Sequence, residues 1–224
     1  MKIGIVYTAT TPELTELVER ELRDAVGAEA EFINFQDPSI LAEVREERYV
    51  TPTATARLVR LFMDAITAGA DAILNCCSSV GGVADAAQEI GRFSGIPIVR
   101  IDEDMCRAAV RKGTRIAVMA TLSSTLEPTK DTIRRVAREM NKRVELVDAL
   151  LEGAFGLSQD EFKSRMLEKA KEVKDQADVI LFAQGSMAYC EGIIRETCVK
   201  PVFSSPGYGA GAIRKALQEK GLIA

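Results

Sequence analysis

The sequence predicts an α/β protein of two similar lobes, each a mostly parallel sheet flanked by helices, related by a pseudo-twofold axis with a cleft between them. Three observations support this class. Strand-like and helix-like segments alternate along the chain, which is typical of parallel sheets covered by helices. Short continuous apolar runs such as Ala72–Cys76 are typical of strands buried on both faces. The second half also repeats the pattern of the first.

In the first half, Thr or Asp before Pro marks three helix starts, since Pro is favoured in the first helical turn. The expected strands are Ile3–Tyr7, Glu31–Phe35, Ala72–Cys76 and Pro97–Ile101. The expected helices are Pro12–Ala25, a charged segment from Asp37 to about Arg48, Thr51 to about Ala68, Gly81–Arg92, and Asp102–Lys112 ended by Gly113.

The same alternation continues in the second half. The expected strands are Arg115–Ala120, Arg143–Val147, Val179–Ala183 and Pro201–Phe203. The expected helices are Leu126–Asn141, Ser158–Gln176, Met187–Thr197 and Tyr208–Lys220. Ser158 and Glu161 have the spacing of a capping box, which predicts that the second of these helices begins at Ser158.

An internal repeat sets the expected domain boundary. Ala70–Leu74 matches Ala177–Leu181, and Ile3–Thr8 matches Ile116–Thr121. We therefore expect a first α/β lobe over residues 1–112 and a second over residues 113–224. The lobe to which the last helix belongs is left open, because this helix can pack back on the first lobe.

Composition excludes several classes of protein. The 224 residues carry a net charge of −4, which argues against a non-specific nucleic-acid binder. No apolar run approaches the ~18 residues of a membrane span. The N-terminal residues enter a strand-like run directly, so no signal peptide is expected. Five cysteines are an odd number and no disulfide framework, so we expect reduced thiols and a cytoplasmic location.

The chain has no histidine. This excludes nucleophiles activated by histidine and metal sites built on histidine, and leaves Cys, Asp, Glu, Lys, Tyr or water for proton transfer. An adjacent cysteine pair without a second cluster is a poor metal signature, so no metal site is expected. Dinucleotide-binding and P-loop glycine patterns are also absent.

Four loops follow expected strands at the sheet edge where ligands bind in open parallel sheets. These loops are Thr8–Thr11, Cys76–Gly82, Thr121–Thr125 and Gln184–Met187. All are rich in hydroxyl-bearing and small residues. Such groups beside helix N-termini bind anions, although Ser and Thr are also favoured helix caps. Four such loops at the carboxyl ends of parallel strands favour an anionic ligand over simple helix capping. Arg100, Asp102 and Glu103 lie near the end of the fourth strand, and the sequence leaves their role open.

The segment Cys76–Ser79 is the most specific candidate for a catalytic site. A thiol between a strand end and a helix start lies in a positive potential that lowers its pKa. Strand alternation places Cys76 on the side of Leu74 and leaves Cys77 in the turn, so we expect Cys77 to be the reactive thiol. A buried structural cysteine is the competing interpretation. Cys106, Cys190 and Cys198 are interpreted as packing residues, with a minor alternative that Cys190 faces the cleft.

The chain resembles the aspartate/glutamate/hydantoin racemase superfamily over essentially its whole length. Leu74-Asn75-Cys76-Cys77-Ser78-Ser79 is similar to the first-lobe cysteine motif of that family, with Cys77 at the catalytic position. Ala120-Thr121-Leu122-Ser123-Ser124 is similar to its second-lobe Gly-Thr-x-x-Thr element. The resemblance implies cofactor-independent chemistry in which thiols exchange the proton α to a carboxylate, with Thr121 and Ser124 among the carboxylate binders.

The second lobe departs from the family pattern. Where its racemases carry a second cysteine, this chain has Ala183-Gln184-Gly185-Ser186-Met187. Ungapped matching of the repeat sets Gln184 opposite Cys77, and a one-residue slip sets Gly185 there. Neither residue carries a proton. Arylmalonate decarboxylase and maleate isomerase are relatives that use one-sided thiol chemistry.

The leading hypothesis is therefore a cofactor-independent racemase or epimerase acting on a small acid or amino acid, with Cys77 thiolate as the base. The expected substrate-binding residues are Thr8, Thr10, Ser78, Ser79, Thr121, Ser124, Gln184, Gly185 and Ser186. The opposite-face proton is assigned to water, Tyr7 or Cys190. Two alternatives stay open: a single-thiol decarboxylase or cis-trans isomerase of a small dicarboxylate, and a non-catalytic protein that binds a small acid.

The expected partner is a small carboxylate substrate, with no nucleic acid and no membrane. By analogy with relatives, which often form dimers or larger assemblies, a homo-oligomer is an open expectation.

Overall fold

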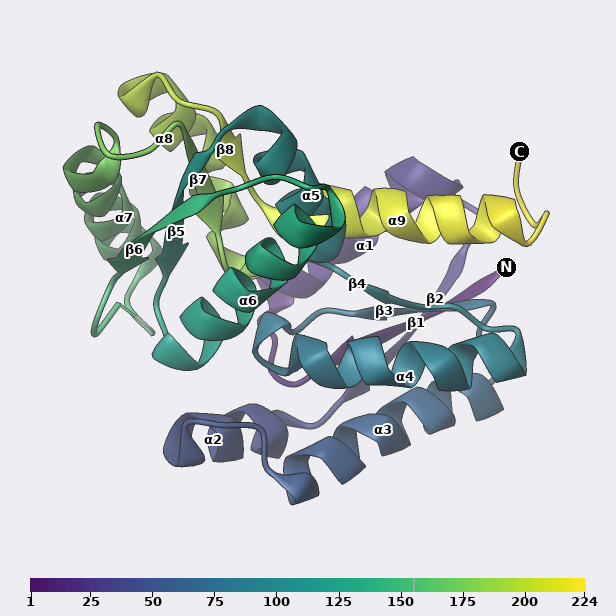
Figure 1. The fold of residues 1–224 in the computed structure, drawn as a ribbon. Helices are drawn as coiled ribbons and strands as arrows, with labels where there is room; N and C mark the ends of the chain where they lie inside the picture. Colours follow the sequence, from purple (N-terminus) through teal and green to yellow (C-terminus); the bar gives the residue numbers. More distant parts are fainter. Residues whose placement is uncertain (155) are drawn as a thin grey trace. The chain divides into compact units, whose positions relative to one another are not determined.

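The computed structural model describes residues 1–154 and 156–224 (Figure 1). Two compact units are present. The first consists of Met1–Ile101 and Pro206–Ala224, and the second of Asp102–Ser205. Each unit contains one four-stranded parallel sheet flanked by helices, which confirms the predicted α/β class.

The sheet of the first unit has the strand order β2-β1-β3-β4. Its strands are β1 (Lys2–Tyr7), β2 (Glu31–Gln36), β3 (Ala72–Asn75) and β4 (Ile98–Arg100). Its helices are α1 (Pro12–Val26), α2 (Pro38–Glu47), α3 (Pro52–Thr67), α4 (Gly81–Ser94) and α9 (Ser205–Glu219), with a short 3₁₀ helix, η1, over Ser78–Val80.

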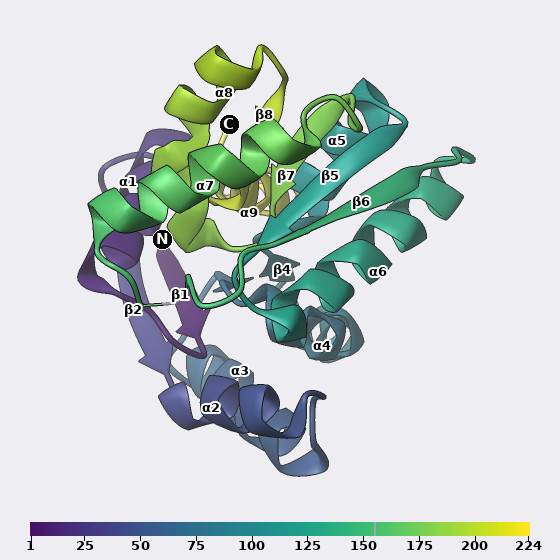
Figure 2. The ribbon, with the colours of Figure 1, turned by 90° about the vertical axis from the view of Figure 1, so that its left-hand side faces the viewer.

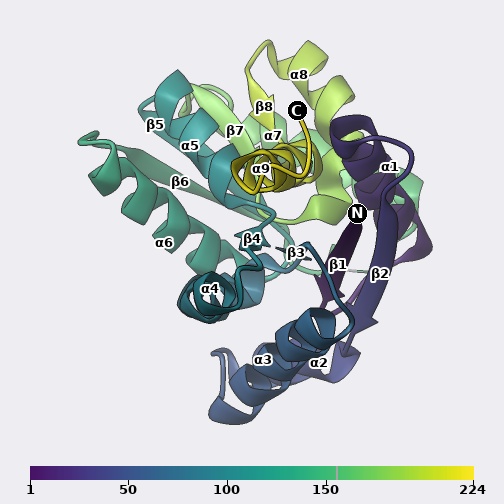
Figure 3. The same ribbon diagram turned by 90° about the vertical axis from the view of Figure 1, so that its right-hand side faces the viewer.

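Both faces of this sheet are covered by helices (Figure 3). Ile5 and Leu74 pack with residues of α1 and α9, whereas Val6 and Ile73 pack with residues of α3 and α4. Successive strand residues point to opposite faces, so a strand covered on both faces must be apolar at every position. This requirement explains the continuous apolar runs of β1 and β3.

The second unit has the equivalent strand order β6-β5-β7-β8, which confirms that the repeat in the sequence encodes a repeated fold. Its strands are β5 (Arg115–Ala120), β6 (Glu145–Leu150), β7 (Val179–Phe182) and β8 (Val202–Phe203). Its helices are α5 (Glu103–Lys112), α6 (Ser123–Glu139), α7 (Gln159–Val173) and α8 (Glu191–Cys198), with the 3₁₀ helix η2 over Gly185–Cys190.

The helices of the second unit also lie on both faces of its sheet, and Figure 2 shows α7 and α6 on opposite sides of β5 and β6. Residues of α7 and α8 share a core with β5 and β7. On the other face α6 packs against β5 and β6, while α5 packs against α6 and β7.

Local sequence signals explain the helix starts. The Thr11 side chain accepts a hydrogen bond from the Leu14 N–H, and the Thr51 side chain accepts one from the Ala54 N–H. Ser158 and Glu161 form the expected capping box. Each of these contacts satisfies a backbone donor that has no partner inside the helix.

Several boundaries differ from the sequence-based expectation. Cys76 lies after β3 rather than within it. The α6 helix begins at Ser123 instead of Leu126, and its start is not displaced by Pro128. The β6 strand runs later, to Leu150, because its pairing with β5 continues to the end of that strand. The expected helix Met187–Thr197 is a 3₁₀ helix followed by α8.

The units also divide the chain at a different point from the expected boundary between residues 112 and 113. The division falls after Ile101, because α5 packs against α6 and β7. The C-terminal segment Pro206–Ala224 groups with the first unit. Gly209 lies so close to Ile101 that a Cβ on it would be 3.0 Å from the Ile101 Cα, which explains the glycine at this position of α9.

Candidate active site

Cys77 lies at the carboxyl edge of the first sheet, where ligands bind in parallel α/β folds. It is the second residue after β3 and directly precedes the 3₁₀ helix η1. Its neighbour from the next strand is Thr8, the first residue after β1. Cys77 is half-buried, and Thr8, Ser78 and Ser79 are buried. The structure therefore brings four of the expected site residues to one edge of the first unit.

Opposing effects act on the Cys77 thiol. Burial raises its pKa, while the Thr8 hydroxyl, the backbone N–H groups of Ser79 and Val80, and the Ser79 hydroxyl lower it. The net pKa is raised, so the expected lowering is wrong, because desolvation disfavours the charged form more than these donors stabilise it. The resting group is a neutral thiol that faces several hydrogen-bond donors able to stabilise a thiolate.

Cys76 and Cys77 belong to opposite faces of the sheet. Cys76 packs with the core under α1 and α9, and Cys77 packs with the core under α3 and α4. Both are half-buried, so exposure does not distinguish them. Their polar surroundings do, because burial raises the pKa of Cys76 well above its ordinary value and the Tyr7 hydroxyl alone offsets this. The donor set thus favours Cys77 over Cys76 as the thiol that ionises.

Asn75 holds the start of the Cys77 turn. Its side-chain Nδ2 donates a hydrogen bond to the Cys77 carbonyl oxygen over 3.0 Å. The Asn75 Oδ1 and the Thr8 Oγ1 are buried and, within the described part of the chain, have no hydrogen-bond partner of ordinary geometry. Unsatisfied buried polar atoms are rare and often mark functional sites. The sequence signal for Asn75 was a polar residue inside an apolar strand.

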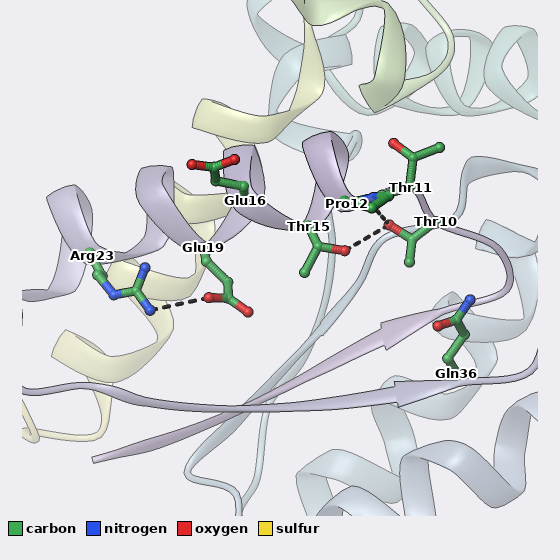
Figure 4. Close-up of a pocket in the computed structure, with 8 residues that line it drawn as sticks. All are labelled: Thr10, Thr11, Pro12, Thr15, Glu16, Glu19, Arg23 and Gln36. Atoms are coloured by element: carbon green, nitrogen blue, oxygen red, sulfur yellow. Dashed lines mark hydrogen bonds and ion pairs between the residues drawn. The ribbon is translucent and has the colours of Figure 1, made fainter.

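Thr10 lies apart from this cluster of donors. Its hydroxyl bonds to the Thr15 hydroxyl over 3.0 Å and to the Thr11 carbonyl. Thr10 lines a groove of about 500 Å³ beside α1 and the end of β2, and Figure 4 shows the side chains of the lining residues. The groove is lined by Thr10, Thr11, Pro12, Thr15, Glu16, Glu19, Arg23 and Gln36. Cys77 is not among these residues, so the groove is separate from the thiol.

The second unit presents a comparable polar edge. Gln184 Oε1 accepts a hydrogen bond from the Thr121 N–H at 2.7 Å, and Gln184 Nε2 donates to the Thr121 hydroxyl at 2.8 Å. Gly185 and Ser186 begin the following 3₁₀ helix. The Ser124 hydroxyl is a buried atom for which no partner is found among the described residues. Gln184 therefore holds the backbone N–H and the hydroxyl of Thr121, the first residue after β5.

The three remaining cysteines are packing residues, as predicted. Cys106, Cys190 and Cys198 are buried. Cys190 belongs to the core under α7 and α8, and burial raises its pKa to about 11. Its assignment as a proton donor is therefore not supported by its position.

No group of three or more Cys, Asp or Glu side chains among the described residues is arranged to hold a metal ion. None of the helices in residues 1–154 and 156–224 is long and apolar enough to cross a membrane.

Comparison with known proteins identifies the family. Residues 3–212 match the Asp/Glu/Hydantoin racemase family. Allantoin racemase from Klebsiella pneumoniae has a similar structure, with a TM-score of 0.65 at 19% identity, covering 100% of this chain and 89% of that one. No curated protein sequence matches the chain.

Two further solved structures are similar. Glutamate racemase from Thermus thermophilus has a TM-score of 0.67 at 18% identity, covering 100% of this chain and 82% of that one. Picrophilus torridus aspartate racemase has a TM-score of 0.59 at 17% identity, covering 98% and 94%. At these identities the likeness shows the fold, and the family match shows membership. The chain belongs to the Asp/Glu/hydantoin racemase family and is an isomerase of that family.

Proposed function

We propose that this protein is a cofactor-independent racemase or epimerase that acts at the carbon α to a carboxylate of a small acid or amino acid, with Cys77 as the base. The observation that carries the proposal is the set of donors around the Cys77 thiol: the Thr8 and Ser79 hydroxyls and the N–H groups of Ser79 and Val80.

The chemistry follows from this set. Once ionised, the Cys77 Sγ takes the α-proton, and the electron pair of the C–H bond moves onto the carboxylate or carbonyl oxygen as an enolate. The backbone N–H groups and hydroxyls of the turn stabilise the negative charge. Returning a proton to the opposite face inverts the carbon. Because the Gln184 amide does not titrate and Cys190 is in the core, we assign that second proton to water.

The remaining site residues enter as part of the same proposal. Thr8, Ser78 and Ser79 in the first unit, and Thr121, Ser124, Gln184, Gly185 and Ser186 in the second, are proposed to bind substrate, whereas Thr10, which lines the separate groove, is left out of the proposed site. All five cysteines are free thiols, which supports a reducing compartment, the cytoplasm.

Solvent exchange followed by proton NMR tests the proposal. Candidate substrates in D₂O are amino acids including aspartate and glutamate, allantoin and other hydantoins, 2-aryl acids and dicarboxylates. We expect the wild type and Cys76→Ala, the matched control for an adjacent thiol, to remove an α-proton signal that Cys77→Ala leaves intact. Exchange that persists in Cys77→Ala overturns the assignment. Chiral analysis then separates racemisation from one-sided exchange.

One observation favours a second reaction. Gln184, whose amide does not titrate, stands where racemases of the family carry their second thiol, which suits a single-thiol decarboxylase or a cis-trans isomerase of a small dicarboxylate. Release of carbon dioxide, or a thioether adduct at Cys77 in the mass spectrum, supports this alternative in place of racemisation.

A further inference from the structure

Arg100 is a buried cation on β4, the strand next to β3 in the sheet, and β3 leads into the turn that contains Cys77. It is the last residue of β4, and its side chain is only 3% exposed. A buried guanidinium is costly unless it is paired, and Arg100 Nη1 lies 2.7 Å from Oδ2 of Asp85 on α4. The side chain thus links the end of β4 to the first turns of α4.

Gly81 is the point of contact between Arg100 and the Cys77 turn. A Cβ added to Gly81 would lie 2.3, 2.4 and 2.9 Å from three guanidinium atoms of Arg100, so the guanidinium or the turn would have to move. Gly81 also closes the turn, because its N–H bonds to the Ser78 carbonyl oxygen. The guanidinium therefore lies directly against the backbone that ends the 3₁₀ helix η1.

The sheet register places a second brace beside the first. Arg100 on β4 is paired with Asn75 on β3, and Asn75 donates to the Cys77 carbonyl oxygen. Asn75 holds the start of the turn, and Arg100 holds its end through Gly81. The two N–H groups that face the thiol, those of Ser79 and Val80, lie between these fixed points.

We propose that Arg100 is a positioning residue that fixes the turn after Cys77 and so keeps the Ser79 and Val80 N–H groups directed at the thiol. The inference rests on the proposed function, because it supports the same thiol. The groups that lower the pKa of Cys77 against the effect of burial are hydroxyls and backbone N–H groups, and Arg100 is proposed to act through the geometry of the latter. The titratable group that faces Cys77 is Cys76, which in turn faces Tyr7.

The test measures the pH dependence of Cys77 alkylation by iodoacetamide, with the modified residue located by peptide fragmentation in a mass spectrometer. The variants are Arg100→Met and Gly81→Ala. The control is Arg92→Met, which removes an exposed arginine from α4, the helix that begins at Gly81, where it pairs with Glu89. Gly81→Ala keeps every charge in the molecule, so a shift of the alkylation midpoint in that variant reports displacement of the turn or the guanidinium and not the loss of a charge.

We expect both test variants to raise the alkylation midpoint by about one pH unit, which lowers the thiolate fraction at pH 8 about tenfold. A merely structural role would lower thermal stability without moving the midpoint. Arg92→Met should match the wild type. If the folded test variants alkylate with the wild-type midpoint, the proposal is wrong.

The test still decides when one variant does not fold, and it is independent of the proposed function. If Arg100→Met does not fold, Gly81→Ala decides by the same criterion. Alkylation requires no turnover, so the proposed function and the positioning role fail independently. Proton exchange that survives Cys77→Ala defeats the former, and an unchanged midpoint in Gly81→Ala defeats the latter.

Discussion

Cys77 and Gln184 hold equivalent positions in the two units. Each is the second residue after its strand, β3 or β7, and each directly precedes a 3₁₀ helix. Their backbones are nearly the same, with φ −126° and ψ 113° at Cys77 and φ −127° and ψ 134° at Gln184. This equivalence supports the ungapped matching of the repeat and not the slip to Gly185. The fold has one thiol and one amide in matching turns.

This equivalence predicts that Gln184→Cys adds a proton carrier. A positioned acid or base contributes about 10²–10⁴-fold to proton transfer, so we expect the ratio of racemisation to solvent exchange to rise at least about tenfold. Chiral chromatography of a substrate that exchanges with the wild type measures the ratio.

Gln184→Ser is the control, because it removes the same contacts with Thr121 without supplying a thiol. A Gln184→Cys protein that exchanges normally yet racemises no faster than Gln184→Ser would contradict the prediction.

Asn75→Ala should destabilise the first unit and slow the alkylation of Cys77. The variant removes the donor to the Cys77 carbonyl oxygen and leaves a small cavity, for which we expect a loss of about 1–2 kcal/mol in the free energy of unfolding. Urea denaturation and iodoacetamide kinetics measure the two effects.

Asn34→Ala is the comparison for this prediction, because its side chain makes an exposed hydrogen bond to Glu19. We expect it to change stability by less than about 0.5 kcal/mol. Equal losses of unfolding free energy in the two variants would show that the buried contact stabilises the protein no more than the exposed one.

The sequence predicted the strands, the repeat and the position of Cys77, because apolar runs and strand-end loops are local signals. It did not predict the direction of the pKa shift of Cys77, since burial depends on the packing of α3 and α4 around it. The Arg100–Gly81 contact joins residues from two elements and has no local signal beyond a charge at the end of an apolar strand. The boundary near Ile101 depends on where α5 packs, which is equally non-local.

Alkaline pH should destabilise the protein partly through Tyr7. The hydroxyl of Tyr7 is buried, and burial raises its pKa, so the folded state holds the proton more tightly than the unfolded state. Its contribution is present below the unfolded pKa of about 10 and is lost above it, at about 1 kcal/mol by pH 11. Tyr7→Phe should therefore flatten the fall of unfolding free energy between pH 9 and 11. Tyr49→Phe, at an exposed tyrosine, should leave the slope unchanged, and identical slopes in all three proteins would exclude Tyr7 as a cause.

Acid pH should act through Asp178 in the opposite sense. Its carboxylate accepts hydrogen bonds from the Arg115 backbone and side chain and from Thr114, and these contacts lower its pKa. A depressed pKa stabilises the fold above the unfolded value of about 3.9, and the stabilisation is lost as pH falls below it. Asp178→Asn should thus unfold at lower urea than the wild type at pH 7, with the gap narrowing below about pH 4. Asp131→Asn, which removes an exposed partner of Arg134, should show little gap at either pH. A gap for Asp178→Asn that stays constant from pH 7 to pH 3 would mean that its carboxylate charge is not what ties β5 to β7.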